Sequence, residues 1–356
     1  MELKNLSCGR FLRGFAILMV AVLGAFVFIT PEAIKSGAAE GLRLCAGVVV
    51  PSLFPFSVVA FFICMSGVLR YGQRCLGRVT RAILGLSWSE FGVFLMSLIS
   101  GYPIGARLVS QMYNGGEISR ERARQLLMFC VNAGPSFIII AVGNGMIGYK
   151  NAGVILFASH ITAAVIICRI VTLKRVSIAK PCTKVAWAPL SDCFVKAVAS
   201  AANGMFSICA FVVLFSVVCE LIRIMPVSAA AKDIICCFAE VTSGLAGANV
   251  SIPLISFFLG FSGFSVIFQV MASVGEIGFS FVSLVLSRLA HGVVSFVICK
   301  LLLCAFPVST ETVSNGVVAA YNANLLSPPA IAALCLMLVV FAFYVSKNVG
   351  NRAKYE

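Results

Sequence analysis

Charged residues are scarce in this chain. Only 11% of its 356 residues are Asp, Glu, Lys or Arg, whereas 60% are hydrophobic. Soluble domains carry roughly a quarter charged residues, so this composition excludes an ordinary soluble protein and predicts a polytopic membrane protein. Acidic residues are the rarer sign, with 13 Asp+Glu against 27 Lys+Arg. The basic residues stand in short loops between apolar runs, which indicates membrane topology and lipid partners rather than a nucleic-acid partner.

Catalytic and metal-binding signatures are also missing. The chain has no GxSxG, HExxH, Walker or CxxC sequence, and no Ser/His/Asp set suggests hydrolysis. His160 and His291 are its only histidines, and they lie far apart without metal-ligand spacing. The 15 cysteines stand mostly singly in apolar runs, where we interpret them as small buried hydrophobes. We therefore expect no enzyme activity, no metal site and no cofactor.

Long apolar runs are what the chain has in abundance. A transmembrane helix needs about 20 apolar residues, and about 8–10 segments approach that length. The first resembles a signal peptide, but its length favours a transmembrane helix. We expect an all-α polytopic membrane protein with hydrophobic segments at 11–30, 45–69, 89–112, 124–142, 151–172, 197–222, 229–248, 252–275, 279–305 and 328–346.

The segment at 89–112 contains poor helix formers at the depth where a helix is required. It includes LISGYPIGAR at 98–107, with two glycines and a proline. The basic loops before and after this segment are both predicted to lie inside, which a full crossing would not allow. We therefore predict a re-entrant hairpin that turns at SGYPIGA. Non-helical backbone at membrane depth is tolerated where protein or a wet cavity satisfies its polar groups, so the hairpin should line a cavity.

An internal repeat provides a second broken segment, at 252–275. At one constant spacing, Val79-Thr80 pairs with Val241-Thr242, Gly85 with Gly247, and Ser100-Gly101-Tyr102 with Ser262-Gly263-Phe264. Duplicated halves with matching interruptions are typical of secondary transporters. The alternative is a duplicated scaffold whose glycines only allow close helix packing. We divide the chain into an N-terminal transmembrane helix at 1–40, repeats at 41–175 and 190–305, and a C-terminal transmembrane helix with a basic tail at 306–356.

Glu240 is the most informative single residue, because it lies in the middle of the apolar segment IICCFAEVTSGLAG. An ionisable side chain at that depth costs about 2.5–3.5 kcal/mol on insertion scales and normally faces a partner or a wet cavity. Burial raises the pKa of a carboxyl group, so Glu240 could couple a proton to substrate movement. The alternative is that the segment lies at an interface, where Glu240 is merely solvated.

Several other polar residues are candidates for binding the substrate. The Arg107 guanidinium could hold a carboxylate bidentately, or it could reach the inner surface as an anchor. Asn132 precedes Gly134-Pro135, where it could bind a ligand or cap its own broken helix. Gln269 is a neutral hydrogen-bonding candidate in the second broken segment. The predicted site is completed by Ser100, Gly101, Tyr102, Thr242, Ser262 and Gly263.

Five motifs resemble one family in their order along the chain. They are PSLFPF (51–56), SGYPIGA (100–106), NAGPSF (132–137), EVTSG (240–244) and GFSGFSVIFQV (260–270). They resemble the YlbJ-type sporulation integral membrane proteins, within the wider nucleoside-recognition or Gate-domain group. The resemblance implies dipicolinate transport during endospore formation, across the cell membrane or a forespore membrane. It also implies distant similarity to concentrative nucleoside transporters, which use paired re-entrant hairpins.

The resulting hypothesis is a transporter that moves a small polar or anionic solute by alternating access. H+ or Na+ is the coupling ion to consider, and a homo-oligomer or other spore-membrane proteins are the partners to consider. One rival keeps the fold and changes the substrate to a nucleoside or another small solute. The other rival is a spore-membrane scaffold that transports nothing.

Overall fold

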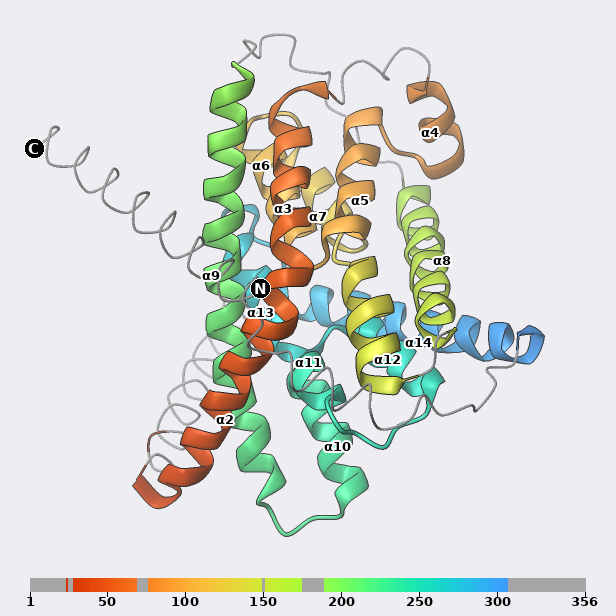
Figure 1. Cartoon of the computed structure of the whole chain (residues 1–356). Helices are drawn as coiled ribbons and strands as arrows, with labels where there is room; N and C mark the ends of the chain where they lie inside the picture. The colour runs from red at the N-terminus through yellow and green to blue at the C-terminus, as the bar shows by residue number, and fades with distance from the viewer. Residues whose placement is uncertain (1–23, 25–27, 69–75, 149–150, 175–188, 307–356) are drawn as a thin grey trace, which may run out of the picture.

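The computed structural model describes residues 24, 28–68, 76–148, 151–174 and 189–306. All regular secondary structure in these residues is helical, which confirms the predicted all-α class (Figure 1). Most of the predicted segment at 11–30 and all of that at 328–346 lie outside the described residues. Within the described residues, five helices are long and apolar enough to cross a membrane, or six if one bent pair counts as a span. They are Pro31–Met65, Ala152–Leu173, Leu190–Arg223, Ile252–Ser273 and Phe281–Ala305.

The first span is one continuous helix that starts well before the predicted segment at 45–69. It consists of α2 (Pro31–Leu44), the π-helical stretch η1 (Cys45–Val49) and α3 (Val50–Met65). Pro51 is the second residue of α3 and lacks a backbone donor, which explains why the helix widens just before it. Helix α9 (Leu190–Arg223) runs alongside α2 and α3 (Figure 1). Gly37 and Gly41 allow this close contact, because a Cβ at either would lie 2.7 Å from an α9 Cα.

The predicted hairpin at 89–112 is present. Helix α4 (Gly77–Leu84) leads into α5 (Trp88–Ser100), and α6 (Ile104–Asn114) follows a break at residues 101–103. The chain folds back at this break, because a Cβ added at Gly105 of α6 would overlap the Ser97 Cβ of α5. A straight continuation would keep these two positions far apart. The predicted reversal of the chain at SGYPIGA is therefore confirmed, and its re-entry into the membrane from one side stays a prediction.

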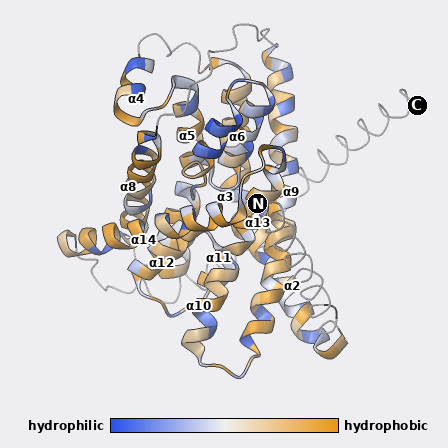
Figure 2. Cartoon of the chain, turned by 180° about the vertical axis from the view of Figure 1, so that it is seen from behind, coloured by the Kyte–Doolittle hydropathy of each residue, from blue (hydrophilic) through white to orange (hydrophobic). Residues whose placement is uncertain are grey.

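The two ends of the hairpin are tied together at the same side of the molecule. Glu90, near the start of α5, forms an ion pair with Arg122 of α7 (Arg120–Leu127), at 2.7 Å from Nε to Oε1. The Arg122 guanidinium also donates to the Gly85 carbonyl and to Gln125 Oε1. Hydrophilic residues gather on α4 and around α6 at this end, whereas α8, α12 and α14 are mostly hydrophobic (Figure 2). The arrangement agrees with a hairpin that enters and leaves on one side.

The predicted segment at 124–142 is interrupted rather than continuous. Helix α7 ends at Leu127, and the π-helix η3 (Ser136–Ile147) begins after Pro135. Residues 128–134 between them, called the extended segment below, form turns at 128–130 and have no regular secondary structure at 131–134. Helix α8 (Ala152–Leu173) then packs against η3. The NAGP sequence explains the break, because Pro135 lacks an amide donor and Gly134 disfavours helix.

The predicted segment at 229–248 is also broken. Helix α10 (Ala229–Ala239) stops at Glu240, whose φ of −147° and ψ of 119° are extended, and α11 (Val241–Leu245) follows. Its neighbours are α12 (Ile252–Phe261), α13 (Gly263–Ser273), the short η4 (Gly275–Ile277) and α14 (Phe281–Ala305). Figure 1 shows α14 running across the direction of α9 and α8.

The predicted hairpin at 252–275 is wrong in one respect. The helix break occurs at Ser262, which has φ 76°, but Ile252–Ser273 forms one apolar span of 22 residues. Contacts across the fold explain the difference: α12 is held along α14, where a Cβ at Gly260 would lie 2.8 Å from Gly292 Cα. Two consecutive residues with positive φ, Ser262 and Gly263, interrupt the helix here without reversing the chain.

The paired glycines of the sequence repeat share a positive φ. Gly85 and Gly247 have φ of 70° and 81°, and Gly101 and Gly263 have φ of 81° and 76°. Each φ is positive, which favours glycine, but the ψ of 174° at Gly101 differs from the 21° at Gly85. The helices that follow differ, since α6 folds back and α13 continues onward. The duplication of whole halves stays a prediction.

Candidate functional site

The breaks in the helices meet in pairs inside the protein. In the first pair, the hairpin tip contacts the extended segment, because a Cβ at Gly101 would lie 3.2 Å from Gly134 N. In the second pair, the break after α12 contacts the break after α10, with a Gly263 Cβ placed 3.1 Å from Val241 N. Glycine is needed at these crossings because any side chain would separate the two backbones. Non-helical backbone is thereby concentrated in one region of the core.

A small cavity lies between these two pairs of breaks. It has about 20 Å³ of free space, enough for about one water molecule. Five of the predicted site residues line it, namely Gly101, Tyr102, Glu240, Thr242 and Gln269. The remaining wall is mostly apolar and comes from η1, α3, α9, α13 and the 133–137 region, through Val49, Leu53, Ala133, Gly134, Phe137, Ile208, Val212 and Val266. The sequence predicted the polar side of this cavity but not the apolar side.

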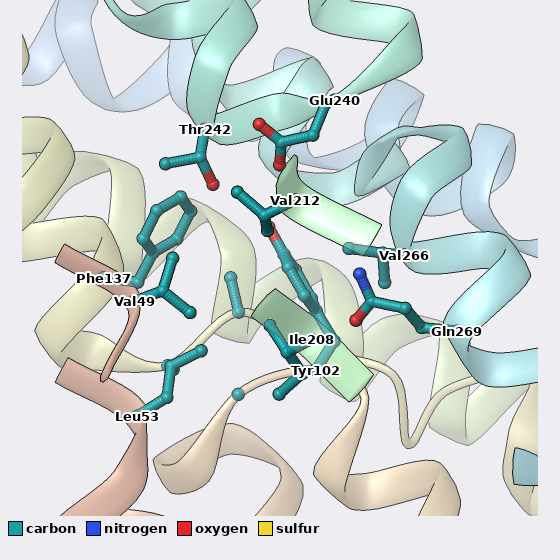
Figure 3. Close-up of a pocket in the computed structure, with 13 residues that line it drawn as sticks. Val49, Leu53, Tyr102, Phe137, Ile208, Val212, Glu240, Thr242, Val266 and Gln269 are labelled. Carbon is teal, nitrogen blue, oxygen red and sulfur yellow. The ribbon is translucent and has the colours of Figure 1, made fainter. Parts of the chain in front are cut away.

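Glu240 is held at the start of α11. Its side chain is only 1% exposed and accepts a hydrogen bond from the Ser243 backbone N–H, which caps the helix. None of the ion pairs in the described residues includes Glu240. Figure 3 shows its carboxylate at the cavity, close to Thr242. The solvated alternative for Glu240 is therefore wrong, because the residue is buried.

Two further polar groups at the cavity have no hydrogen-bond partner. They are the Tyr102 hydroxyl and Gln269 Oε1, both on buried side chains. The Gln269 amide nitrogen donates to Ser265 Oγ at 3.2 Å, one turn earlier on α13. Figure 3 shows the Gln269 amide and the Tyr102 ring extending toward the region that Glu240 and Thr242 reach from the other side. An unpaired buried polar group costs about 1–3 kcal/mol, so this cluster suits a polar ligand or water.

Two helices begin beside the cavity. Helix α6 starts immediately after Gly101 and Tyr102, and α13 starts at Gly263, with Val266 and Gln269 in its first two turns. The first amide groups of a helix lack intrahelical partners, and the helix dipole is positive at this end. The backbone around the cavity therefore favours negative charge.

The other predicted polar residues mainly support the breaks. Asn132 Nδ2 donates to Phe129 O and Ser97 Oγ, while its Oδ1 has no partner. The amide thus caps its own broken helix and keeps one free acceptor. Ser100 Oγ donates to the Phe56 carbonyl of α3 at 3.1 Å. Ser262 Oγ donates within its own turn, to Gly260 O.

Arg107 lies away from the cavity. It extends from α6 toward α9, where a Cβ at Gly204 would be 3.5 Å from its Nη1. Its Nε is buried without a partner. The residue is absent from the cavity lining, so direct contact with a ligand would require a different conformation. Its role as a substrate clamp stays a prediction.

A buried cluster of Arg288, His160 and His291 behind the extended segment was missed in the sequence. Arg288 of α14 is fully buried and donates to the Val131 and Met128 carbonyls. His160 of α8 accepts from Ala133 N–H at 3.0 Å, and the rings of His160 and His291 stack with centroids 4.4 Å apart. The available signal was Arg288 itself, an isolated charge within the apolar run at 279–305, where intramembrane charges mark functional sites.

Comparison with known proteins gives one informative similarity. The chain is 26% identical over 326 residues to the "Sporulation integral membrane protein YlbJ" of Bacillus subtilis (strain 168), which covers 79% of this chain and 80% of that protein. No family model and no solved structure matches the chain. The similarity supports the YlbJ-type assignment that the motifs predicted. Together with the apolar helices, it also supports a multi-pass membrane protein.

Proposed function

We propose that this YlbJ-type membrane protein is a transporter that moves a small anionic solute by alternating access. Dipicolinate, a planar dicarboxylate, is the solute that we propose, and endospore formation is the setting. The name of the Bacillus subtilis relative supports the sporulation setting. The transport activity rests on the site.

The observation that carries this proposal is the cavity between the paired helix breaks. Glu240, Tyr102 and Gln269 bring polar atoms to it, and two of these atoms lack partners. Broken helices that meet around a polar site are the arrangement that secondary transporters use for solute and ion binding. A scaffold needs only close packing, and unpaired buried polar atoms would destabilise it without benefit.

The charge around the cavity favours an anion together with a proton. The starts of α6 and α13 present positive helix ends, which attract a carboxylate. An ionised Glu240 would repel that carboxylate, whereas a protonated Glu240 can donate a hydrogen bond to it. Entry of the anion is therefore coupled to a proton on Glu240, and H+ is the coupling ion in this proposal.

The cavity is so small that the protein must change conformation before it can bind the proposed solute. Space for about one water molecule cannot hold a dicarboxylate, so the described conformation is too narrow for the proposed solute. Loading requires the hairpin tip at Gly101 to separate from Gly263 and Glu240. Alternating access provides this separation toward one side at a time.

Uptake into proteoliposomes tests the proposal. Purified protein should accumulate labelled dipicolinate when the outside is acidic, and unlabelled nucleosides should not compete. The Glu240→Gln variant should lose the response to the proton gradient. The matched control is Glu276→Gln, because Glu276 is exposed on η4 and should transport as the wild type does.

Other outcomes would contradict specific parts of the proposal. Competition by nucleosides would favour the rival substrate. Gradient-driven uptake by Glu240→Gln equal to that of the wild type would refute proton coupling through this residue. Absence of uptake of any solute, with normal spore maturation in cells that carry Glu240→Gln, would favour the scaffold.

A further inference from the structure

The extended segment that forms one wall of the cavity is held by side chains from distant helices. Its Met128 and Val131 carbonyls accept from the two terminal nitrogens of Arg288, at 2.5 Å for Met128. Arg288 comes from α14, more than 150 residues further along the chain, and its side chain is fully buried. The carbonyls that the broken helix leaves free are thus satisfied by one guanidinium.

Arginine is suited to this position for a geometric reason. Its guanidinium is planar and presents donors at fixed angles, so one side chain can hold two carbonyls at once. None of the ion pairs in the described residues includes Arg288. The carbonyl dipoles of the extended segment therefore supply the polar environment that the buried cation needs.

A second contact fixes the next part of the same segment. His160 Nε2 accepts from the Ala133 N–H, so the proton of the neutral ring lies on Nδ1. His291, one turn after Arg288 on α14, contacts the His160 backbone carbonyl through Nε2 at 3.2 Å. Helices α8 and α14 thus act together on Ala133. Ala133 and Gly134 line the cavity.

We propose that Arg288 is a positioning residue for the solute site. By holding the Met128 and Val131 carbonyls, it keeps Ala133 and Gly134 against Gly101 and so sets the shape of the cavity wall. Arg288 does not line the cavity and acts through the backbone of the extended segment. Its effect on solute binding rests on the proposed function, whereas its effect on the segment does not.

Alkylation of Cys130 measures the segment directly. This thiol lies between the two held carbonyls and is fully buried. Membranes that contain the protein are treated with N-ethylmaleimide, and labelling at each cysteine is followed by peptide mass spectrometry. We expect Arg288→Gln to accelerate labelling of Cys130 about tenfold or more, because local opening exposes the thiol. Loss of a nearby cation disfavours the reactive thiolate, so a faster reaction reports access rather than charge.

Two controls separate local opening from general loosening. Cys168 of α8 is equally buried and should stay unlabelled in Arg288→Gln. Lys300→Gln removes an exposed cation from the same helix and should leave Cys130 protected. Arg288→Lys, which keeps a donor, should give an intermediate rate and serves if the Gln variant does not insert. Unchanged labelling of Cys130, or an equal rise at Cys168, would overturn the proposal.

Dipicolinate uptake then tests the link to the solute. Arg288→Lys should raise the half-saturating concentration about tenfold while the maximal rate changes less, because the cavity wall is displaced. A decrease in the maximal rate alone, with an unchanged half-saturating concentration, would overturn the proposal that Arg288 positions the cavity wall for the solute. If the wild type transports no dipicolinate, the proposed function fails, and the labelling of Cys130 still decides the role of Arg288 in the segment.

Discussion

Removal of the charge of Glu90 should destabilise the protein strongly. Glu90 and Arg122 are 1% and 2% exposed, and both carboxylate oxygens accept from the guanidinium, at 2.7 and 2.8 Å. A Glu90→Gln variant leaves the Arg122 cation buried without its counter-charge. Loss of one partner of a buried ion pair costs about 3–5 kcal/mol. Arg122 keeps hydrogen bonds to Gln125 and Gly85, which places the expected loss near the lower end of that range.

The measurement is reversible unfolding in mixed micelles as the fraction of denaturing detergent is raised. A loss of about 3 kcal/mol changes the unfolding equilibrium constant about a hundredfold. Glu40→Gln is the matched control, because Glu40 pairs with Arg43 on the surface, where such pairs contribute about 0–1 kcal/mol. The double variant Glu90→Leu with Arg122→Leu should recover most of the loss, since it leaves no buried charge unpaired.

Equal stability of Glu90→Gln and Glu40→Gln would refute this reasoning. It would mean that the start of α5 and α7 do not meet in a dry interface. The Glu90–Arg122 ion pair would then not hold the two ends of the hairpin together. A double variant that is less stable than Glu90→Gln would also contradict this reasoning, because the loss would then not come from an unpaired buried Arg122 cation.

Three further substitutions test the packing and the cavity. Gly105→Ala should cost about 1–3 kcal/mol in the same unfolding assay, because its Cβ would overlap the Cys130 carbonyl oxygen, whereas Gly275→Ala, with open space around it, should be neutral. Gly41→Leu should separate α2 from α9 and lower the thermal midpoint in detergent by several degrees. Tyr102→Phe should leave the free energy of unfolding within about 0.5 kcal/mol of that of the wild type, because the hydroxyl has no partner. The same variant should raise the half-saturating concentration for dipicolinate uptake about 2- to 10-fold, because the hydroxyl would bind the solute.

The first hairpin could be predicted because its signals are local. Glycines and a proline fall together at 101–105, and basic loops on both flanks require the same side. The second break has the same glycine signal at Gly263 but a different outcome. What decides there is the contact of Gly260 with Gly292, from two helices that are distant in sequence. A helix breaker therefore predicts where a helix is interrupted, and tertiary packing determines whether the chain reverses.

The candidate site divides in the same way. Glu240 and Gln269 were predictable as polar residues in apolar runs, and both reach the cavity. Arg107 met the same criterion but lies against α9, because its direction depends on how the hairpin packs. Arg288 also met that criterion and was overlooked. Sequence reasoning finds which polar residues are buried, but the fold decides which of them share a cavity.

The extended segment at 128–134 connects the hairpin to the later helices. Gly105 of α6 contacts it from one side, at the Cys130 carbonyl oxygen, and Arg288 of α14 holds it from another. A shift of α14 relative to the hairpin must therefore move this segment or break the Arg288 contacts. Because Ala133 and Gly134 belong to the cavity wall, such a shift changes the shape of the site. In the proposed transport cycle, movement of α14 relative to the hairpin of α5 and α6 opens and closes the cavity by shifting this segment.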